Sequence, residues 1–252
     1  MNNWRIYPLL VADQQHHIDQ SEKFLSSIQP GDDPILYWNL AKPMGLVLGF
    51  SQKQAIVNPF AVEKLSIPVY HRRAGGTAVL VGPHLLCLDV VLPPGHPFIL
   101  PDIVESYRWF GEAWVNALEQ IGIHTRVIPP TEAHTLQARL KQAETADHER
   151  LMNRACYGTL SSYEVVVGQH KVVGLDMIRR KTGSLLQAGV LLHWDTDVLA
   201  QLLGHTPQEQ QLLRTGLRQR AVGIDILAER VITTGEVISA FEQAIDRHIE
   251  IA

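Results

Sequence analysis

The sequence predicts an α+β fold, in which a mixed β-sheet is flanked by helices. Three observations lead to this prediction. Short apolar runs bounded by Gly and Pro recur through residues 34–92, apolar positions in 102–121 repeat at steps of three and four, and helical periodicity returns after Trp194. We therefore expect residues 1–194 to contain the sheet and residues 195–252 to form a helical C-terminal portion packed on it.

The first half of the chain predicts strands interrupted by two helices. One helix ends before Pro30-Gly31. Asn58-Pro59 starts a shorter helix that runs through Leu65, because Pro is favoured at the first helical position. The strand candidates are apolar runs of strand length between turn residues. They read PILYWNL, MGLVLGF, IPVYHRR, TAVLV and LLCLDVVL in the sequence.

In the second half of the chain the periodicity changes twice. The amphipathic helix predicted for 102–121 stops at Gly122. The segment 132–150 is polar and helix-prone with few apolar anchors, so it is either an exposed helix or a mobile loop. The runs SYEVVVGQHKVVGLDM and SLLQAGVLLHW then predict three more strands. Thr233 followed by Glu236 is a capping box that starts the last helix.

Composition excludes several classes of protein. The net charge of −4 gives no field that attracts nucleic acid, so we expect no nucleic-acid partner. Two cysteines, Cys87 and Cys156, cannot form a secreted disulfide framework, and the histidines lack the spacing of a metal site, so no metal is expected. The N-terminus lacks a signal-peptide pattern and no apolar stretch reaches transmembrane length. We expect a cytoplasmic protein without a membrane partner.

The stretch HRRAGGTAV is the first candidate binding segment. Gly75 and Gly76 lie between two predicted strands, where a backbone without Cβ atoms can approach a ligand closely. Arg72 and Arg73 precede them, and the fixed fork of arginine suits a carboxylate or a phosphate. An ordinary turn with solvated arginines is the alternative, and these residues alone leave both interpretations open.

Cys156 and Lys171 form the second candidate. A thiol is a good nucleophile as the thiolate, and a nearby cation favours that form. Lys171 leads into Val172-Val173, which predicts a strand that enters the core and can aim the ammonium into a cleft. The alternative is a buried structural cysteine and a solvated hairpin lysine.

Several motifs in order resemble the lipoate–protein ligase family of the biotin/lipoate attachment superfamily. LGFSQ, HRRAGGTAV and KVVGLDMIRRKTGSLLQAG carry the resemblance, which runs from about residue 4 to 194. In addition, ACYGTLSSYE is similar to the A-C-F-x-x-x-S-x-Y-E motif of a cysteine-dependent octanoyltransferase branch, with matches that include Cys156 and Glu164. The resemblance implies that residues 1–194 form a biotin/lipoate ligase-like catalytic domain.

The resemblance also implies an activity and its residues. An octanoyl or lipoyl group would pass to a lysine of a lipoyl carrier domain through a thioester on Cys156, and Lys171 would stabilise the oxyanion. The Gly-Gly loop would lie along the acyl chain, in a substrate site that includes Arg72, Arg73, Gly75, Gly76 and Gly174. The donor would be an acyl carrier protein or a lipoyl donor protein. The acceptor would be a lipoyl domain or a glycine cleavage H-like protein, and no cofactor would be needed.

Two other activities fit the same motifs. An ATP-dependent lipoate–protein ligase would use ATP and Mg²⁺, with Arg72 and Arg73 on the acyl-adenylate phosphate and an incidental Cys156. A non-catalytic member would only bind the acyl group or its carrier. The sequence departs from the family pattern where polar residues are replaced, and these replacements favour keeping the binding-only alternative. The family histidines are replaced by Val81 and Ala188, the arginine by His71, and the Ser or Thr by Ala74.

Overall fold

A computed structural model describes residues 4–139 and 146–251 of the chain. Its main sheet has seven strands in the order β1-β2-β6-β10-β9-β8-β7. β1 and β2 run parallel and the other neighbouring pairs are antiparallel, so the sheet is mixed as predicted. The strands are β1 (Arg5–Ala12), β2 (Ile35–Ala41), β6 (Leu85–Leu92), β7 (Arg126–Val127), β8 (Val165–Val167), β9 (His170–Arg180) and β10 (Gly183–Leu191).

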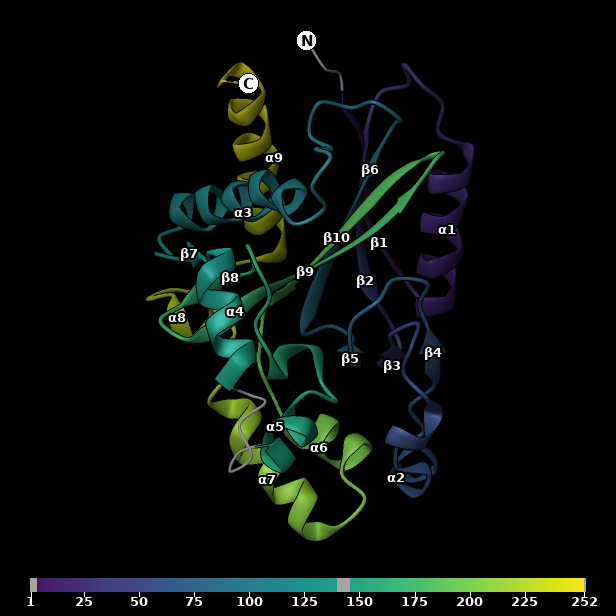
Figure 1. Cartoon of the computed structure of the whole chain (residues 1–252), viewed down its shortest axis with the longest axis vertical. Helices are drawn as coiled ribbons and strands as arrows, with labels where there is room; N and C mark the ends of the chain where they lie inside the picture. Colours follow the sequence, from purple (N-terminus) through teal and green to yellow (C-terminus); the bar gives the residue numbers. More distant parts are fainter. Residues whose placement is uncertain (1–3, 140–145, 252) are drawn as a thin grey trace.

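A second sheet of three strands lies beside the main sheet (Figure 1). Its strands are in the order β4-β3-β5, with bounds β3 (Gly45–Leu48), β4 (Val69–His71) and β5 (Val79–Val81). Val79 and Val81 pack in one buried cluster with Leu85 of the main sheet and with Tyr157. The two sheets therefore meet across this cluster, close to both candidate segments.

Helices cover both faces of the main sheet (Figure 1). Helix α1 (Gln14–Ser27) lies on one face, and α3 (Arg108–Gln120) and α9 (Thr234–Ile251) lie on the other. The alternation of side chains along β6 serves both layers. Leu88 is buried in the cluster of α3 and α9, whereas Val91 is buried in the cluster that contains side chains of α1.

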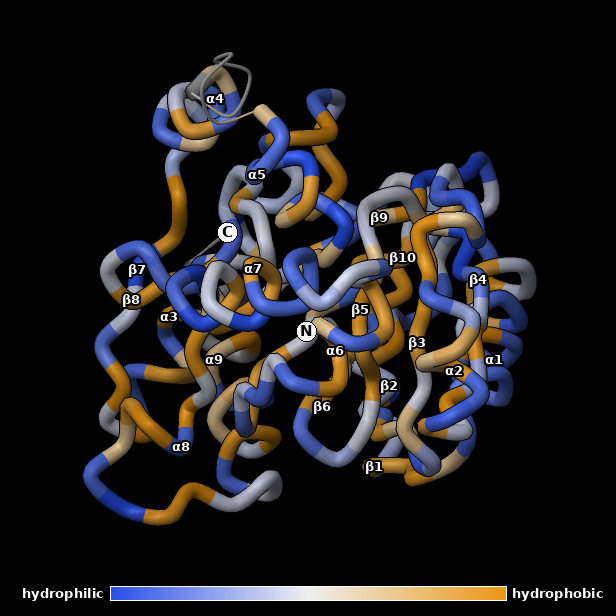
Figure 2. The backbone as a smooth tube through the Cα atoms, turned by 90° about the horizontal axis from the view of Figure 1, so that it is seen from below, coloured by the Kyte–Doolittle hydropathy of each residue, from blue (hydrophilic) through white to orange (hydrophobic). Residues whose placement is uncertain are grey.

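An aromatic group at the centre of the core joins distant parts of the chain. Trp38 of β2, Trp114 of α3 and Phe241 of α9 contact one another, with ring centroids 4.3 to 6.0 Å apart. Trp109 is also buried, so both tryptophans of the predicted long helix are core residues. In Figure 2 the central strands are mostly hydrophobic, whereas hydrophilic segments lie mainly at the periphery. The last helix thus completes the core of the main sheet.

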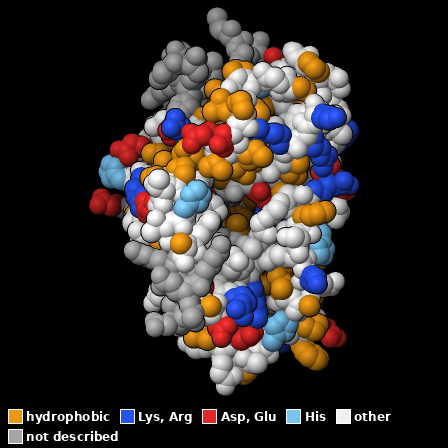
Figure 3. Space-filling view, in the orientation of Figure 1, with side chains coloured by type: hydrophobic (Ala, Val, Ile, Leu, Met, Phe, Trp, Pro, Cys, Tyr) orange, Lys and Arg blue, Asp and Glu red, His pale blue; other side chains and the backbone are white. Residues whose placement is uncertain are grey.

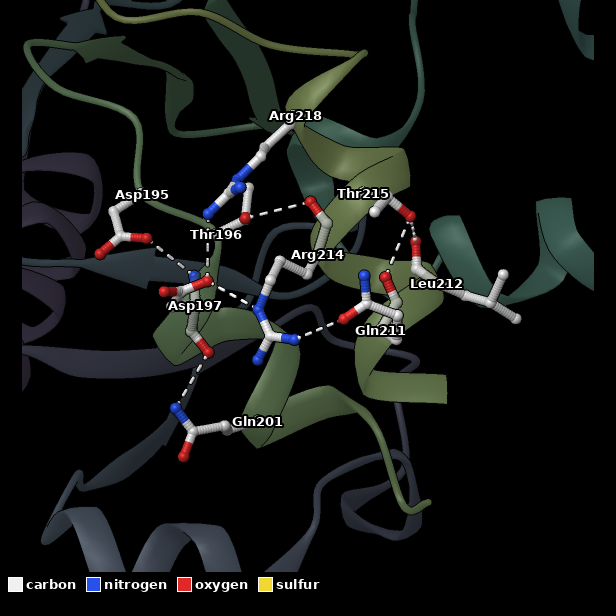
Figure 4. Close-up of polar contacts among 9 residues, drawn as sticks. All are labelled: Asp195, Thr196, Asp197, Gln201, Gln211, Leu212, Arg214, Thr215 and Arg218. Carbon is white, nitrogen blue, oxygen red and sulfur yellow. Dashed lines mark hydrogen bonds and ion pairs between the residues drawn. The ribbon is translucent and has the colours of Figure 1, made fainter. Parts of the chain in front are cut away.

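The remaining C-terminal helices form a pair at the other end of the molecule. Helix α6 (Asp197–Leu203) packs on α7 (Pro207–Arg218), and a short helix, α8 (Ile224–Leu227), follows. Figure 4 shows the polar contacts that hold the pair together. The Nε of Arg214 donates to Asp197 at 2.7 Å, and the hydroxyl of Thr196 donates to the carbonyl of Arg214 at 3.1 Å. After Trp194 the described chain is thus mainly helical.

The predicted short helices and caps agree with the structure. Helix α2 spans Pro59–Leu65, and the side chain of Asn58 accepts hydrogen bonds from the first turn. The capping box before α9 forms in both directions. Glu236 accepts from the N–H of Thr233 at 2.9 Å, and the N–H of Glu236 donates to the Thr233 hydroxyl at 3.2 Å. Among the described residues, no helix combines the length and the apolar character that crossing a membrane requires.

Three boundaries differ from the sequence prediction. Strand β1 was not predicted, and Pro8 within it fits its place at the edge of the sheet. Helix α3 begins at Arg108 and not at 102, because Asp102 caps a separate turn by accepting from the N–H of Val104 at 2.7 Å. The segment 132–150 contains two helices, and its residues 140–145 lie outside the described part of the chain. These helices are α4 (Pro130–Arg139) and α5 (Ala146–Met152).

Candidate active site

Cys156 is held by the end of the Gly-Gly loop. It follows α5 and begins a 3₁₀ turn, Cys156–Gly158. Its N–H donates to the carbonyl of Ala78 at 2.7 Å, and the N–H of Ala78 donates to the carbonyl of Arg154 at 3.1 Å. These two backbone bonds join segments that are far apart in the sequence. The loop and the thiol therefore have a fixed relative position.

Lys171 points into the protein and forms a buried ion pair. Its Nζ lies 2.8 and 2.7 Å from the two carboxylate oxygens of Glu164, and the two side chains are 1% and 3% exposed. The same Nζ donates to the carbonyl of Cys156 at 2.8 Å. Burial raises the pKa of Glu164, and the Lys171 charge opposes that shift. The pair places a cation at the backbone of the candidate nucleophile, in agreement with the inward orientation predicted for this lysine.

The backbone around Lys171 explains why its side chain turns inward. Lys171 is the second residue of β9, where its N–H donates to the carbonyl of Arg220 at 2.8 Å. Its own carbonyl accepts from the N–H of Val222 at 3.0 Å. Both backbone groups are thus occupied by the chain that follows α7. The C-terminal portion contributes in this way to the position of the candidate catalytic cation.

The Gly-Gly loop is closed by the side chain of Arg72. Its Nε donates to the carbonyl of Gly75 at 3.1 Å, and its Nη2 donates to that of Thr77 at 3.3 Å and lies 3.2 Å from the carboxylate of Asp176. Gly76 has φ +80°, which L side chains rarely adopt. The guanidinium of Arg72 is therefore bound to the backbone of the Gly-Gly loop and holds the loop in one conformation.

Two cavities meet at Cys156. The inner pocket lies between the two sheets and α1, and the outer cleft opens on the side of α4 and α5. Cys156 and Arg72 line both cavities, Gly174 lines the inner pocket, and Gly76 and Lys171 line the outer cleft. In the orientation of Figure 1, the surface is hollowed near the middle of the molecule (Figure 3). A group on the Cys156 sulfur could therefore extend inward while a second reactant approaches from outside.

Arg73 and Gly75 do not belong to the described residues that line either cavity. Arg73 is exposed, and its Nε lies 3.6 Å from Glu22 of α1. Gly75 is exposed as well, and no atom lies within 4 Å of the place where its Cβ would be. The structure thus brings together five of the seven residues predicted for the site and leaves these two at its rim.

The sheet register builds the floor of the inner pocket in two rows. Cross-strand partners lie about 5 Å apart, so residues linked by pairing form a continuous strip. The first row runs from β2 to β9 through Asn39, Cys87, Gly189 and Gly174. The second row runs in the same direction through Tyr37, Asp89, Gln187 and Asp176.

Glycines keep the nucleophile end of the inner pocket open. We use the term nucleophile end for Cys156 and Gly174 of the inner pocket together with Glu164 and Lys171, which line the adjoining outer cleft. A Cβ on Gly174 would lie 3.8 Å from the sulfur of Cys156 and 3.5 Å from the hydroxyl of Tyr157. That hydroxyl donates to the carbonyl of Gly189 at 2.6 Å. Any larger side chain at position 174 would therefore contact the sulfur.

The far end of the inner pocket is polar, and sequence reasoning missed it. Its members come from α1, β2, β6 and β10, and they are Gln14, Ser21, Asn39, Asp89 and Gln187. Asp89 accepts from the hydroxyl of Ser21 and, at 2.9 Å, from Gln187. Burial raises the pKa of Asp89 to about 6. The available signal was an aspartate within the apolar strand LLCLDVVL. Within the described ranges, no three His, Cys, Asp or Glu side chains are placed to hold a metal ion.

Comparison with known proteins identifies the family. Residues 13–246 match the family described as the lipoyl protein ligase A/B catalytic domain. The chain belongs to this family. It is 30% identical over 219 residues to octanoyltransferase LipM of Anoxybacillus flavithermus, covering 85% of this chain and 73% of that protein. It is 28% identical over 236 residues to octanoyltransferase LipM of Bacillus subtilis, covering 87% and 81%. The family predicted from the sequence is confirmed.

Solved structures agree on the fold. A bipartite lipoate–protein ligase from Thermoplasma acidophilum, described with its E2 lipoyl domain, superposes with a TM-score of 0.75 at 21% identity, covering 99% of this chain and 85% of that one. A lipoate–protein ligase A bound with ATP gives a TM-score of 0.71 at 20% identity, covering 98% and 86%. The predicted fold class, an α+β domain like that of the lipoate ligases, is therefore confirmed.

Proposed function

We propose that the protein is an acyltransferase that moves an octanoyl or lipoyl group onto a lysine of a lipoyl carrier domain through a thioester on Cys156. One observation carries the proposal. Cys156 lines both the inner pocket and the outer cleft, and Lys171 of the Lys171–Glu164 ion pair is bound to its backbone carbonyl. The names of the relatives, octanoyltransferase LipM, support the same activity.

In the first half-reaction, the Cys156 sulfur attacks the carbonyl carbon of a donor thioester. A new carbon–sulfur bond forms, and the carbonyl oxygen carries negative charge in the tetrahedral intermediate. The Lys171 ammonium, fixed by Glu164 and by the Cys156 carbonyl, stabilises that charge. The bond to the donor sulfur then breaks, and the donor thiol leaves with the proton that Cys156 gave up.

In the second half-reaction, the acyl chain lies in the inner pocket while the acceptor lysine enters by the outer cleft. Its neutral amine attacks the thioester carbon, the amide bond forms, and the Cys156 thiolate leaves with the proton that the amine loses. The exchange of a thioester for an amide is favourable. The two cavities thus separate the acyl group from the acceptor and bring them together only at the sulfur.

The ligase alternative has weaker support. A lipoate–protein ligase would need cations free to hold the phosphate of ATP. The guanidinium of Arg72 is already bound to the carbonyls of its own loop and to Asp176, and Arg73 lies beside Glu22 outside both cavities. Arg72 and Arg73, which the ligase interpretation assigned to the acyl-adenylate phosphate, therefore fit that role poorly in this arrangement.

The partners and the organisation follow from this proposal. The donor is an acyl carrier protein or a lipoyl donor protein, and the acceptor is a lipoyl domain or a glycine cleavage H-like protein. Residues 1–194 carry the chemistry, and residues 195–252 support it by holding Lys171 and the core. The transferase needs no cofactor. A nucleophilic thiol must stay reduced, which favours the cytoplasm as its location.

Intact mass spectrometry tests the proposal. The protein is incubated with octanoyl carrier protein, with octanoate plus ATP, or with neither. We expect one octanoyl mass from the carrier alone, removable by hydroxylamine, and its loss in Cys156→Ser. Cys87→Ser tests the other cysteine and should still gain the octanoyl mass, because burial and the nearby Asp89 charge raise the pKa of Cys87 to about 12 and keep it protonated; the presence of the mass and not its rate is compared, since Cys87 lines the inner pocket. Full transfer by Cys156→Ser would refute the thioester, and loading only with ATP would favour the ligase.

A further inference from the structure

The far end of the inner pocket does not match a plain hydrocarbon chain. Ser21, Asn39 and Asp89 are each 3% exposed, and all three face the space that an acyl chain on Cys156 would enter. Buried polar groups cost free energy unless they are hydrogen-bonded. A hydrocarbon terminus beside them would supply no hydrogen bond.

Sheet geometry places this polar end within reach of the acyl chain. Gly174, next to the Cys156 sulfur, lies on β9, and Asp89 lies on β6, with β10 between them. Neighbouring strands are about 4.8 Å apart and a strand rises about 3.4 Å per residue, so Asp89, two strands across and two residues along from Gly174, is roughly 12 Å away. A medium-chain acyl group can span that distance. Its distal atoms would therefore lie against Asp89 and its neighbours.

The acceptor capacity of the far end is only partly used. The carboxylate of Asp89 can accept about four hydrogen bonds, and it accepts from Ser21 and Gln187. The hydroxyl of Ser21 has one proton, yet it also lies 2.8 Å from the carbonyl of His17. The Oε1 of Gln14 is buried in the described structure without a partner. A ligand that donates a hydrogen bond here would satisfy these acceptors.

We propose that the inner pocket selects a medium-chain acyl group whose distal end carries a hydrogen-bond donor, a hydroxyl or an N–H, with Asp89 and Gln14 as the residues that recognise it. This inference rests on the proposed acyltransferase function and departs from its octanoyl or lipoyl group in one respect, the hydrogen-bond donor at the distal end of the chain. A site built around a hydrogen bond discriminates strongly against an analogue that lacks the group, because the buried polar partners are then left unpaired.

The test compares acyl donors of equal size on the same carrier protein. Heptanoyl, octanoyl and nonanoyl thioesters are paired with ω-hydroxyhexanoyl, ω-hydroxyheptanoyl and ω-hydroxyoctanoyl thioesters, in which the terminal methyl is replaced by a hydroxyl. The kcat/KM for acylation of Cys156 is measured by intact mass. We expect the hydroxyl chain to exceed its isostere by about tenfold or more at one of these lengths.

Variants of the far end show whether Asp89 and Gln14 cause the preference. Asp89→Leu should reduce or invert the preference for the hydroxyl chain. Gln14→Leu should also reduce this preference, and because Gln14 lies on α1, this variant leaves the buried strand β6 unchanged. Asp19→Asn is the matched control, because Asp19 lies on the same helix but is exposed and bonds to Gln15 at 2.8 Å. It should keep the wild-type preference.

The outcomes separate this inference from the proposed function. Equal rates for each isosteric pair in the wild-type protein would overturn the inference and leave the acyltransferase intact, since octanoyl would still load on Cys156. A hydroxyl preference that survives in both Asp89→Leu and Gln14→Leu would also overturn it. If no chain of either kind loads, the proposed function fails and this inference fails with it.

Discussion

The nucleophile end of the site and the far end of the inner pocket each have a buried carboxylate, and the two carboxylates have different partners. Glu164 is bonded to the ammonium of Lys171 through both oxygens, at 2.8 and 2.7 Å. Asp89 is bonded only to neutral donors among the described residues, the Ser21 hydroxyl and the Gln187 amide. Both side chains are almost completely buried, so the difference lies in the partner and not in the exposure.

This difference separates a site for reaction from a site for recognition. A buried ion pair fixes a charge in place, and at the nucleophile end the fixed charge is the Lys171 ammonium at the carbonyl of Cys156, to which we assign the stabilisation of the oxyanion. Burial raises the pKa of both carboxylates, that of Asp89 to about 6; the Lys171 charge opposes the shift at Glu164, whereas only neutral hydrogen bonds oppose it at Asp89. A ligand that donates a hydrogen bond to Asp89 would therefore stabilise its carboxylate.

The largest expected effect comes from breaking the ion pair. Lys171→Ala should lower the single-turnover acyl transfer rate by about 100-fold or more, because one positioned donor to the oxyanion is lost. It should also destabilise the fold by about 3–5 kcal/mol, since Glu164 is left as an unpaired buried charge. Lys181→Ala is the matched control, because Lys181 lies in the exposed turn between β9 and β10. Denaturant unfolding and transfer rates measure the two effects.

A double variant separates catalysis from stability in that experiment. Lys171→Met combined with Glu164→Gln removes both charges and should recover most of the lost stability. The transfer rate should stay low, because the cation is still absent. If the double variant regains the rate along with the stability, Lys171 has only a structural role.

The pH dependence of stability should report the far end. The pKa of Asp89 is raised from 3.8 to about 6 in the folded state. Its contribution to stability is therefore complete below pH 4 and is lost as the pH rises through about 6. The total is about 3 kcal/mol at 1.36 kcal/mol per pH unit. Asn resembles the protonated form of Asp89. At low pH the free energy of unfolding of Asp89→Asn should therefore be equal to that of the wild type or lower. As the pH rises to 7, the variant should become more stable relative to the wild type.

Urea unfolding of both proteins between pH 4 and pH 8 measures this difference. Asp19→Asn on the exposed face of α1 supplies the baseline for a carboxylate that is open to solvent. A stability difference between wild type and Asp89→Asn that does not change with pH would contradict the raised pKa and the contrast between the two ends.

The smallest expected effect concerns the loop beside the nucleophile end. Gly76→Ala should destabilise the protein by about 1–2 kcal/mol, because Gly76 has φ +80° and a side chain is strained there. Gly75→Ala should cost less, since its Cβ would meet no atom within 4 Å. Thermal unfolding of both variants measures this pair. Equal losses of stability in Gly75→Ala and Gly76→Ala would show that the loop changes conformation to accept a side chain at position 76. The wall of the outer cleft would then change as well.

Much of the fold could be predicted because its signals are local. Apolar runs between turn residues marked the strands, and the spacing of Thr233 and Glu236 marked the start of α9. The motif around Cys156 likewise placed the candidate nucleophile and directed attention to Lys171. Strand β1 was missed because its apolar pattern is weak, with alternating exposure along an edge strand that contains Pro8.

The far end of the inner pocket could not be predicted because it depends on register. Ser21 and Asp89 are 68 positions apart, and Gln187 is 98 positions from Asp89. Only the pairing of β6 with β10 places Gln187 opposite Asp89, and only the packing of α1 brings Ser21 to the same point. The sequence contained one local sign, a charged residue in an apolar strand, without its partners.

The place of α9 in the core has a consequence for synthesis on the ribosome. Phe241 packs against Trp38 and Trp114, and the indole N–H of Trp38 donates to Glu242 at 2.9 Å. The chain emerges from its N-terminus, so the face of the main sheet that α3 and α9 share has only α3 as cover until α9 has been translated. The aromatic side chains of Trp38 and Trp114 therefore lack their partner Phe241 during most of the synthesis of residues 4–251.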